Sequence, residues 1–278
     1  MFAGRKLIIA TKHKKESVIE PLFHKAFGVE CFIDPTFDSD LLGTFTGEIE
    51  RIEGPIDTLR KKCLLAMKLN NCDLGVASEG SFGAHPSCFY VPADDELIIF
   101  IDKKNNLEIM ARSISTATNF NGKYISNDKE LLEFAALVDF PSHGLIIQKN
   151  KDDFSFIKKG IHDKSELISH FHYCMKHFNS SYVETDMRAM HNPMRMEVIK
   201  DAVIRLIDKI NSKCPKCSTR GYSIEELIKG LPCNYCGDPT NSILAHRYSC
   251  KLCDYQEVIM HPSGKRFEEP MYCDICNP

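Results

Sequence analysis

The chain has 278 residues and carries 38 acidic against 35 basic side chains, a formal net charge of -3 at pH 7. This balance excludes a general positive field that would attract nucleic acid. The apolar run Leu7–Ala10 is far shorter than a signal-peptide core, and no stretch approaches a membrane span. We therefore expect a cytoplasmic protein with no membrane partner, one sizeable core and a small appended module.

The order of apolar and polar residues along 1–210 alternates between the spacing of strands and that of helices. Strands are expected at 5–10, 29–33, 74–77, 96–101, 107–115, 144–148 and 153–157. Helices are expected at 18–27, 57–70, 127–137, 164–178 and 194–210, with Asp57 as the cap of the second. The polar turn Lys103–Asn106 is typical of a hairpin, so the sheet is predicted to be mixed. The pattern indicates an α/β domain over 1–210 and a cysteine-rich module over 211–278.

Four Cys-x-x-Cys pairs occupy the last quarter of the chain. Their members are Cys214 and Cys217, Cys233 and Cys236, Cys250 and Cys253, and Cys273 and Cys276. Two residues between ligands let a tight turn present both sulfurs to one metal, and eight thiolates suffice for two tetrahedral zinc sites. Both sites are expected to be structural, because four thiolates leave no open coordination position.

The pairing of these cysteines into two sites has two alternatives. Sequential pairing joins the first pair with the second and the third with the fourth. Nested pairing joins the second pair with the third in one site and the first with the fourth in the other, so that the outer site encloses the inner one. Both give loop lengths that suit a zinc ribbon, and such ribbons dock protein or nucleic-acid partners in many settings.

Three polar segments of the α/β domain are candidates for a ligand site. The turn 11–16 carries lysines ahead of a helix, whose amino end favours anions. Glu79 follows an apolar strand and precedes glycines that permit close approach, so it can hold Mg2+ together with substrate phosphates. The segment 184–195 is dense in charge before the last helix, and its Arg188 and Arg195 have no simple structural explanation.

The helix 164–178 offers an alternative metal site. His170, Cys174 and His177 share one face at spacings i, i+4 and i+7. A core stripe of aromatic residues beside histidines explains the same spacing.

The order of these segments resembles that of the non-canonical purine NTP phosphatases, the inosine and xanthosine triphosphatases. Residues 11–15 stand where that family has a Thr/Asn/Lys phosphate-binding turn, and 57–60 is similar to its Glu-Thr-Leu-Arg helix start. Residues 73–79 resemble its strand ending in Glu, 111–115 its Ala-Arg-Ser-Ala-Ser strand, and 194–203 its closing helix motif. With the cysteine module, the whole arrangement also resembles an uncharacterised bacterial family of unknown function.

The first resemblance implies an ITPase-like α/β fold, a mixed sheet flanked by helices, and Mg2+-dependent hydrolysis of a nucleoside triphosphate or related phosphorylated nucleotide. It implies that Glu79 holds the metal with Asp57 or Glu53 as a second carboxylate, and that Lys15 and Arg195 neutralise phosphate charge. Further substrate-binding candidates are Thr11, Lys12 and His13 in the turn. Position and polarity alone assign Arg188, His191 and Asn192 to the base or sugar pocket. The resemblance also suggests a homodimer.

One departure from that family favours a second hypothesis. The threonine and tyrosine of the closing motif are replaced here, at Met194 and at Ile199. The alternative is therefore a non-catalytic nucleotide-binding protein, whose zinc module docks a protein or nucleic-acid partner.

Overall fold

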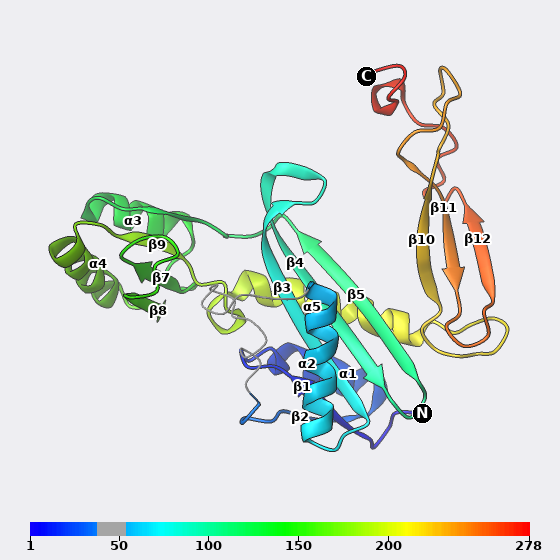
Figure 1. Cartoon of the computed structure of the whole chain (residues 1–278), viewed down its shortest axis with the longest axis horizontal. Helices are drawn as coiled ribbons and strands as arrows, with labels where there is room; N and C mark the ends of the chain where they lie inside the picture. The colour runs from blue at the N-terminus through cyan, green and yellow to red at the C-terminus, as the bar shows by residue number, and fades with distance from the viewer. Residues whose placement is uncertain (38–53) are drawn as a thin grey trace. The chain divides into compact units, whose positions relative to one another are not determined.

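The computed structural model describes residues 1–37 and 54–278, which form two compact units, Met1–Leu206 and Ile207–Pro278 (Figure 1). The described part of the chain is mixed α/β, with three sheets and five α-helices. In the same residues, every helix is too short or too polar to cross a membrane.

A five-stranded sheet with the order β2-β1-β3-β4-β5 forms the centre of the first unit. Its strands are β1 (Lys6–Ala10), β2 (Glu30–Phe32), β3 (Leu74–His85), β4 (Cys88–Asp102) and β5 (Leu107–Ser115). β1 is parallel to β2 and β3, whereas β4 is antiparallel to both β3 and β5. The predicted mixed sheet is confirmed. Because ligands bind at the carboxyl ends of parallel strands, the turn after β1 occupies the favoured edge.

Helix α2 (Pro55–Leu69) covers one face of this sheet (Figure 1). It buries Leu59, Cys63 and Met67 in one cluster with Ala77 and Ile99 of the sheet. These strand residues have odd numbers, and successive strand residues point to opposite faces. The even-numbered residues of β3 and β4 therefore face the other way.

Helices α1 (Glu16–Phe27) and α5 (Pro193–Asn211) lie on that opposite face. Phe23 of α1 stacks on Phe100 of β4, with ring centroids 6.1 Å apart. Asp201 of α5 accepts a hydrogen bond from Ser113 of β5 at 2.6 Å. The candidate site residues on β3 and β4 are divided in the same way, since odd-numbered ones face α2 and even-numbered ones face α1 and α5.

A second, four-stranded antiparallel sheet completes the first unit and was not predicted. Its strands are, in spatial order, β6 (Gly122–Tyr124), β9 (Tyr182–Thr185), β7 (Leu145–Gln148) and β8 (Ile157–Ile161). Helices α3 (Asp128–Leu137) and α4 (Lys164–Phe178) pack on it around Leu131, Phe134 and Phe171. β6 and β9 have only three and four residues, too few for a period-2 pattern to distinguish them from a loop.

Several predicted boundaries are wrong. β3 continues to His85 and β4 begins at Cys88, so both strands are longer than predicted and Glu79 lies within β3 rather than after its end. Two further differences have local reasons. Asp57 does not cap α2, because the helix begins at Pro55 with Gly54 as its N-cap, and Asp57 lies in the first turn. The strand expected at 153–157 begins at Ile157 instead. The Asp153 side chain accepts hydrogen bonds from the amide and hydroxyl of Ser155, and this local turn competes with strand pairing.

The second unit is built on a three-stranded antiparallel sheet, β10 (Ser223–Lys229), β11 (Ile243–Ser249) and β12 (Gln256–Met260). The short helix η3 (Pro270–Tyr272) follows. Its buried cluster is small and consists largely of cysteine and tyrosine, among them Cys214, Tyr222 and Cys250. So little apolar core predicts that bound metal supplies much of the folding free energy of this unit.

Candidate functional site

The predicted phosphate-binding turn places a lysine in a buried position at the end of β1. Lys15 is the residue before α1, and its ammonium group donates to Ser78 Oγ at 3.0 Å and lies 3.8 Å from Glu96 Oε2. Lys15 is only 4% exposed, whereas Lys12 is exposed and His13 is half-buried. Burial lowers the pKa of Lys15 to about 7, although the charge of Glu96 opposes this shift. A lysine with a pKa of about 7 is present in both its charged and its neutral form near neutral pH.

Arg195 joins the same site from the opposite end of the unit's sequence. Its Nε donates to Glu96 Oε1 at 2.6 Å, and its side chain is 0% exposed. Glu96 lies opposite Gly80 in the β3–β4 ladder, where a Cβ would stand 2.3 Å from Glu96 Oε1. Only glycine at this position leaves room for the carboxylate. Lys15 and Arg195 are therefore brought together, as counter-charges of Glu96.

Three buried oxygen atoms in this region have no hydrogen-bond partner in the part of the chain that is described: Thr11 Oγ1, Asp94 Oδ1 and Glu96 Oε2. Thr11 begins the turn that ends at Lys15, and Asp94 lies two residues before Glu96 on the same face of β4. Burial, and after it the charge of Glu96, raises the pKa of Asp94 to about 8. Buried acceptors without partners are typical of a site that is completed by a ligand.

Glu79, the predicted metal ligand, lies on the other face of the sheet. It pairs with Leu97 in the ladder and therefore points to the α2 side. Lys62 of α2 donates to Glu79 Oε2 and to the Ser78 carbonyl oxygen, both at 3.2 Å. Two lysines thus contact Ser78, Lys15 at its side chain and Lys62 at its backbone. The structure pairs Glu79 with Lys62 rather than with Lys15 and Arg195.

The second carboxylates considered from the sequence are less central. Asp57 has a side chain that is 64% exposed and pairs with Arg60 at 3.0 Å. Arg60 also binds Glu108 on β5 at 2.7 Å. Glu53 lies outside the described residues. Asp57 therefore has the surroundings of a surface ion pair on a helix.

Asn192, predicted to bind substrate, has a structural role. It is 0% exposed, and its Oδ1 accepts from the backbone amide of Arg195 at 3.0 Å, which satisfies a free donor at the start of α5. Its amide nitrogen donates to Asn119 Oδ1 at 2.9 Å. The residue fixes the beginning of the helix that carries Arg195.

Arg188 and His191 lie together on the four-stranded sheet. Arg188 makes a two-point ion pair with Asp186, with Nη2 2.6 Å from Oδ2 and Nε 3.0 Å from Oδ1. His191 Nδ1 is 2.9 Å from Nε2 of His162. Burial lowers the pKa of His191, which favours its neutral form.

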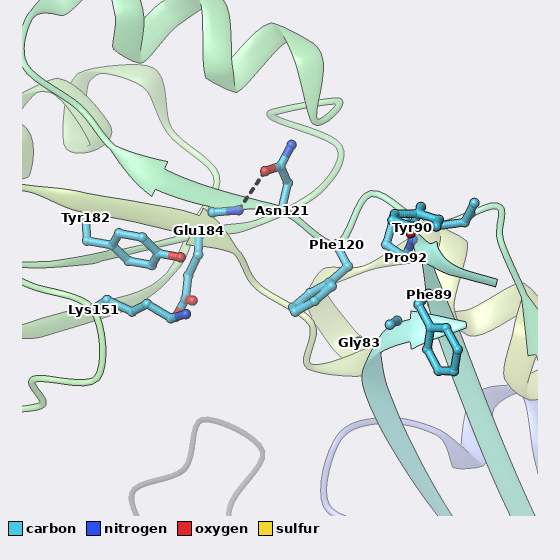
Figure 2. Close-up of a pocket in the computed structure, with 12 residues that line it drawn as sticks. Gly83, Phe89, Tyr90, Pro92, Phe120, Asn121, Lys151, Tyr182 and Glu184 are labelled. Atoms are coloured by element: carbon cyan, nitrogen blue, oxygen red, sulfur yellow. Dashed lines mark hydrogen bonds between the residues drawn. The ribbon is translucent and has the colours of Figure 1, made fainter. Parts of the chain in front are cut away.

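A groove of about 410 Å³ opens between the tip of the β3–β4 hairpin and the four-stranded sheet (Figure 2). Figure 2 shows Phe120 between the hairpin residues on one side and Tyr182, Lys151 and Glu184 on the other. Aromatic rings with a few polar groups are typical of a site for a planar ligand. The complete lining is Gly83, Ala84, Phe89, Tyr90, Val91, Pro92, Phe120, Asn121, Gly122, Lys151, Tyr182 and Glu184.

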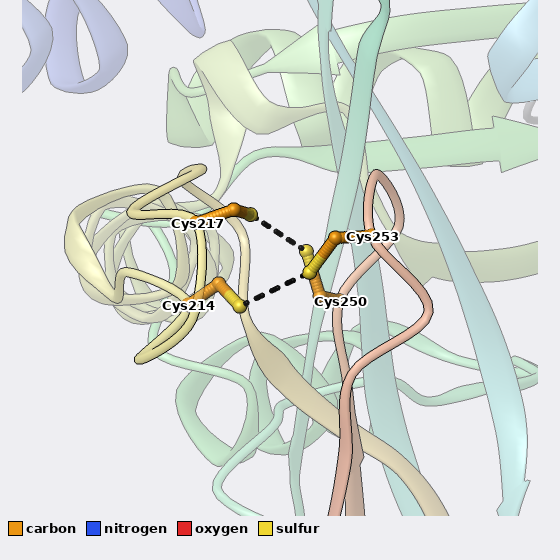
Figure 3. Close-up of side chains that lie close together, drawn as sticks. All are labelled: Cys214, Cys217, Cys250 and Cys253. Carbon is orange, nitrogen blue, oxygen red and sulfur yellow. Dashed lines mark hydrogen bonds between the residues drawn. The ribbon is translucent and has the colours of Figure 1, made fainter.

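The eight predicted cysteine ligands form two clusters in the second unit, in which all sulfurs lie within 4.8 Å of one another. One cluster is Cys214, Cys217, Cys250 and Cys253 (Figure 3). The other is Cys233, Cys236, Cys273 and Cys276. The pairs therefore interleave, first with third and second with fourth. Neither the sequential nor the nested alternative is correct.

The sulfur positions fit a tetrahedral metal. The Sγ–Sγ distances of facing pairs are 3.7 Å (Cys214–Cys253), 3.6 Å (Cys217–Cys250), 3.9 Å (Cys233–Cys276) and 3.6 Å (Cys236–Cys273). A tetrahedron with Zn–S bonds of about 2.3 Å requires sulfurs about 3.8 Å apart. Two metal ions can be held, and the four-thiolate donor sets are consistent with zinc.

The interleaved pairing makes the module one interdependent unit. β10 runs from the Cys214 pair to the Cys233 pair, β11 runs back to the Cys250 pair, and β12 leads away again toward the Cys273 pair. Each strand therefore connects the two clusters, and the register of the sheet depends on both.

The alternative metal site on α4 is not formed. Cys174 is buried in the core cluster of the four-stranded sheet. His170 faces Glu166 at 3.4 Å, and the ring of His177 packs on Tyr173 with centroids 4.3 Å apart. The two cysteine clusters are the groups of metal-binding geometry in the described ranges.

A family model described as a domain of unknown function, DUF6671, matches residues 62–278, which is most of the chain. The chain belongs to this family. No curated protein matches the chain.

The DUF6671 region begins at Lys62 and therefore includes Glu79, Glu96, Arg195 and both cysteine clusters. It leaves out the turn that carries Lys15. Within the DUF6671 region, sequence reasoning missed Glu96, although a signal for it exists. Glu96 has the same strand parity as the buried Ile98 and Phe100, so an acidic residue on the covered face was readable from the alternation.

Proposed function

We propose that the first unit binds a phosphorylated nucleotide at the turn after β1 and hydrolyses it. The observation that carries this proposal is the burial of Lys15, with its lowered pKa, beside Glu96 and Arg195 at the carboxyl end of a parallel strand. A buried lysine costs folding free energy, and sites with such perturbed groups are enriched in function. A phosphate there would restore the charged form of Lys15.

The surroundings of the turn suit an anion. The amino end of α1 directs backbone N–H groups and a partial positive charge toward the turn. Lys62 adds a second cation near Ser78 on the opposite face. The resemblance to the purine NTP phosphatases, with its ITPase-like fold, supports the same assignment for residues 11–15.

Mg2+ belongs to the proposal as the partner of the phosphates. The donor set fits a hard cation, since carboxylate and hydroxyl oxygens of Asp94, Glu96 and Thr11 lack hydrogen-bond partners in the described chain. Glu79, the carboxylate that the resemblance assigns to the metal, is held by Lys62 on the other face of the sheet and is not part of this oxygen set. When bound, the ion polarises a phosphate and lowers the pKa of a water molecule.

The groove is the proposed site of the base. Phe82 connects it to the charged site, because its ring lies 5.7 Å from that of Phe120 and 5.1 Å from the guanidinium of Arg195. Phe120 lines the groove. A nucleotide bound across Phe82 would place its base among the aromatic rings of the groove and its phosphates toward Lys15 and Arg195.

The decisive experiment combines hydrolysis with binding. Phosphate and pyrophosphate release is measured over a nucleotide panel, including ITP and XTP, with Mg2+, in the wild type, Lys15→Met, Glu79→Gln and Lys129→Met. Lys129 serves as the control because its side chain is 85% exposed on α3. Release that is lost in Lys15→Met and kept in Lys129→Met supports the proposal.

The same panel separates the second hypothesis. Nucleotide binding by calorimetry without any release would favour a non-catalytic binding protein. Absence of both, in protein that is folded and zinc-loaded, would refute the proposal for this unit. In either case the zinc module remains a structural unit, with the docking of a protein or nucleic-acid partner as its proposed role.

A further inference from the structure

A chain of hydrogen bonds ends at His191 on the four-stranded sheet. His162 Nδ1 lies 2.8 Å from the carbonyl oxygen of Pro141, and His162 Nε2 lies 2.9 Å from His191 Nδ1. The backbone locks the same region, since Gly144 N donates to the His191 carbonyl at 2.8 Å and Asp186 N donates to the Gly144 carbonyl at 2.8 Å. The Pro141 carbonyl, the His162 ring and the His191 ring are therefore hydrogen-bonded in a fixed order.

This order determines where the protons of the neutral rings lie. A carbonyl oxygen only accepts, so His162 must carry its proton on Nδ1. Its Nε2 is then an acceptor, and His191 must donate from Nδ1. The remaining nitrogen, His191 Nε2, is left with a lone pair. A peptide carbonyl thus fixes His191 as a hydrogen-bond acceptor through one intervening histidine.

Two glycines make room for the pair. A Cβ at Gly144 would lie 3.0 Å from His162 Nε2 and 3.0 Å from His191 Cβ. A Cβ at Gly160 would lie 3.0 Å from His191 Nε2 and 3.3 Å from Arg188 Nη2. That point is bonded to the Gly160 Cα and is no ligand position itself, but the two distances place His191 Nε2, an acceptor, and Arg188 Nη2, a donor, near each other beside Gly160.

Asp186 holds both Gly160 and Arg188 in place. It is 0% exposed, and its Oδ2 accepts from the Gly160 amide at 2.9 Å as well as from Arg188. The charged groups that act on His191 are Asp186, Arg188 and Lys14, together with His162. Burial is the largest influence, and it keeps His191 neutral and able to accept a proton.

We propose that His191 Nε2 and Arg188 Nη2 bind a ligand oxygen that carries a proton, and that His162 is the positioning residue that aims His191. Two sources share this chemistry, a hydrolytic water and a sugar hydroxyl of the nucleotide. The assignment to a nucleotide reaction rests on the proposed function, whereas the orientation of the two rings does not.

If the bound oxygen belongs to a water molecule, that water can attack phosphorus. Its O–H proton passes to His191 Nε2 while the oxygen forms a bond to phosphorus. The P–O bond to the leaving phosphate breaks and that oxygen takes the electron pair. The imidazolium later returns the proton to solvent. For a sugar hydroxyl no bond changes, and the pair contributes binding only.

The orientation is tested by 15N-edited NMR of the full-length, zinc-loaded protein at pH 8, which distinguishes pyrrole-type from pyridine-type ring nitrogens. We expect Nδ1–H forms for both His162 and His191, although Nε2–H is the usual form of free histidine. His162→Gln keeps an acceptor and should preserve the form of His191, whereas His162→Phe should lose it. An Nε2–H form of His191 in the wild type would overturn the proposal, whatever the activity.

Kinetics distinguishes the two sources. If the oxygen is the water, His191→Gln lowers kcat by about 100-fold or more, the scale of general-base catalysis, and removes the acidic limb of the kcat profile. If it is a sugar hydroxyl, His191→Gln raises KM for ribonucleotides and leaves deoxyribonucleotides unaffected. His172→Gln, on an exposed face of α4, is the matched control. An active enzyme in which His191→Gln changes neither parameter would contradict the role.

Discussion

Arg195 and Glu96 form an ion pair that is closed to solvent, with Nε 2.6 Å from Oε1 and both side chains at most 1% exposed. Asp95, the neighbour of Glu96, forms the equivalent pair with Arg112 on the other face of the sheet, where the Arg112 side chain is 49% exposed. The same strand therefore presents one buried and one exposed carboxylate–arginine pair. Their comparison measures what burial does to such a pair.

Glu96→Gln is expected to destabilise the first unit by about 3–5 kcal/mol, because it leaves Arg195 buried without its counter-charge. Asp95→Asn should cost about 1 kcal/mol or less, since that pair is solvated. Urea unfolding followed by circular dichroism gives both values. Equal costs for the two variants would show that Arg195 is not held in the closed pair.

The lowered pKa of Lys15 predicts a pH-dependent stability. Its folded-state pKa is about 7, against about 10.4 in the unfolded chain, so the unfolded state binds more protons between these values. Stability due to this residue therefore rises from pH 7 toward pH 10, and Lys15→Met should abolish that rise. Denaturant unfolding at several pH values between 7 and 10 tests it, and parallel curves for both proteins would contradict the burial of a charged lysine.

Asp94 predicts that stability falls as pH rises, in a lower pH range than the rise due to Lys15. Its folded-state pKa of about 8 lies above the unfolded value of about 3.9, so its stabilising contribution is full below about pH 4 and is lost as pH rises to 8. Asp94→Asn should flatten the fall of stability between pH 6.5 and 8, a range in which zinc thiolates persist. A steeper fall in the variant would refute the assignment.

Ligand binding at the Lys15 site should move protons in a direction that identifies the ligand. A phosphate raises the pKa of Lys15 and causes proton uptake at pH 7.5, whereas a cation at Asp94 lowers the pKa of that carboxyl and causes proton release. Calorimetry in two buffers of different ionisation enthalpy measures the number of protons taken up or released. One titration uses a non-hydrolysable nucleotide and a separate one uses Mg2+. Lys15→Met should remove the uptake alone.

The interleaved cysteine pairing predicts coupled metal sites. In protein loaded with 113Cd, one cadmium resonance should correlate with the β-protons of Cys214, Cys217, Cys250 and Cys253. Correlations that join Cys214 to Cys233 would restore the sequential alternative. Because every strand connects both clusters, Cys217→Ser should lose one metal and weaken the other by about tenfold or more in chelator competition. Cys88→Ser, an exposed cysteine outside the clusters, should retain both.

The sequence by itself determined what depends on neighbours along the chain. Cys-x-x-Cys spacing identified all eight members of the clusters, and helical periodicity placed α3 and α4 closely. Asn127 and Asp163 both accept a hydrogen bond from the amide three residues on, and this local interaction needs no tertiary structure. These features could be read directly because their partners lie within a few residues.

Only the tertiary structure decided which distant groups meet. Strand parity directs Glu79 to Lys62 and Glu96 to Lys15 and Arg195, and a shift of one residue in register would exchange the two acids. Spacing allows several pairings of four cysteine pairs, whereas the path of three strands between the clusters selects the interleaved one. Local pattern determines the groups that are present, and long-range chain packing determines the partners that each one finds.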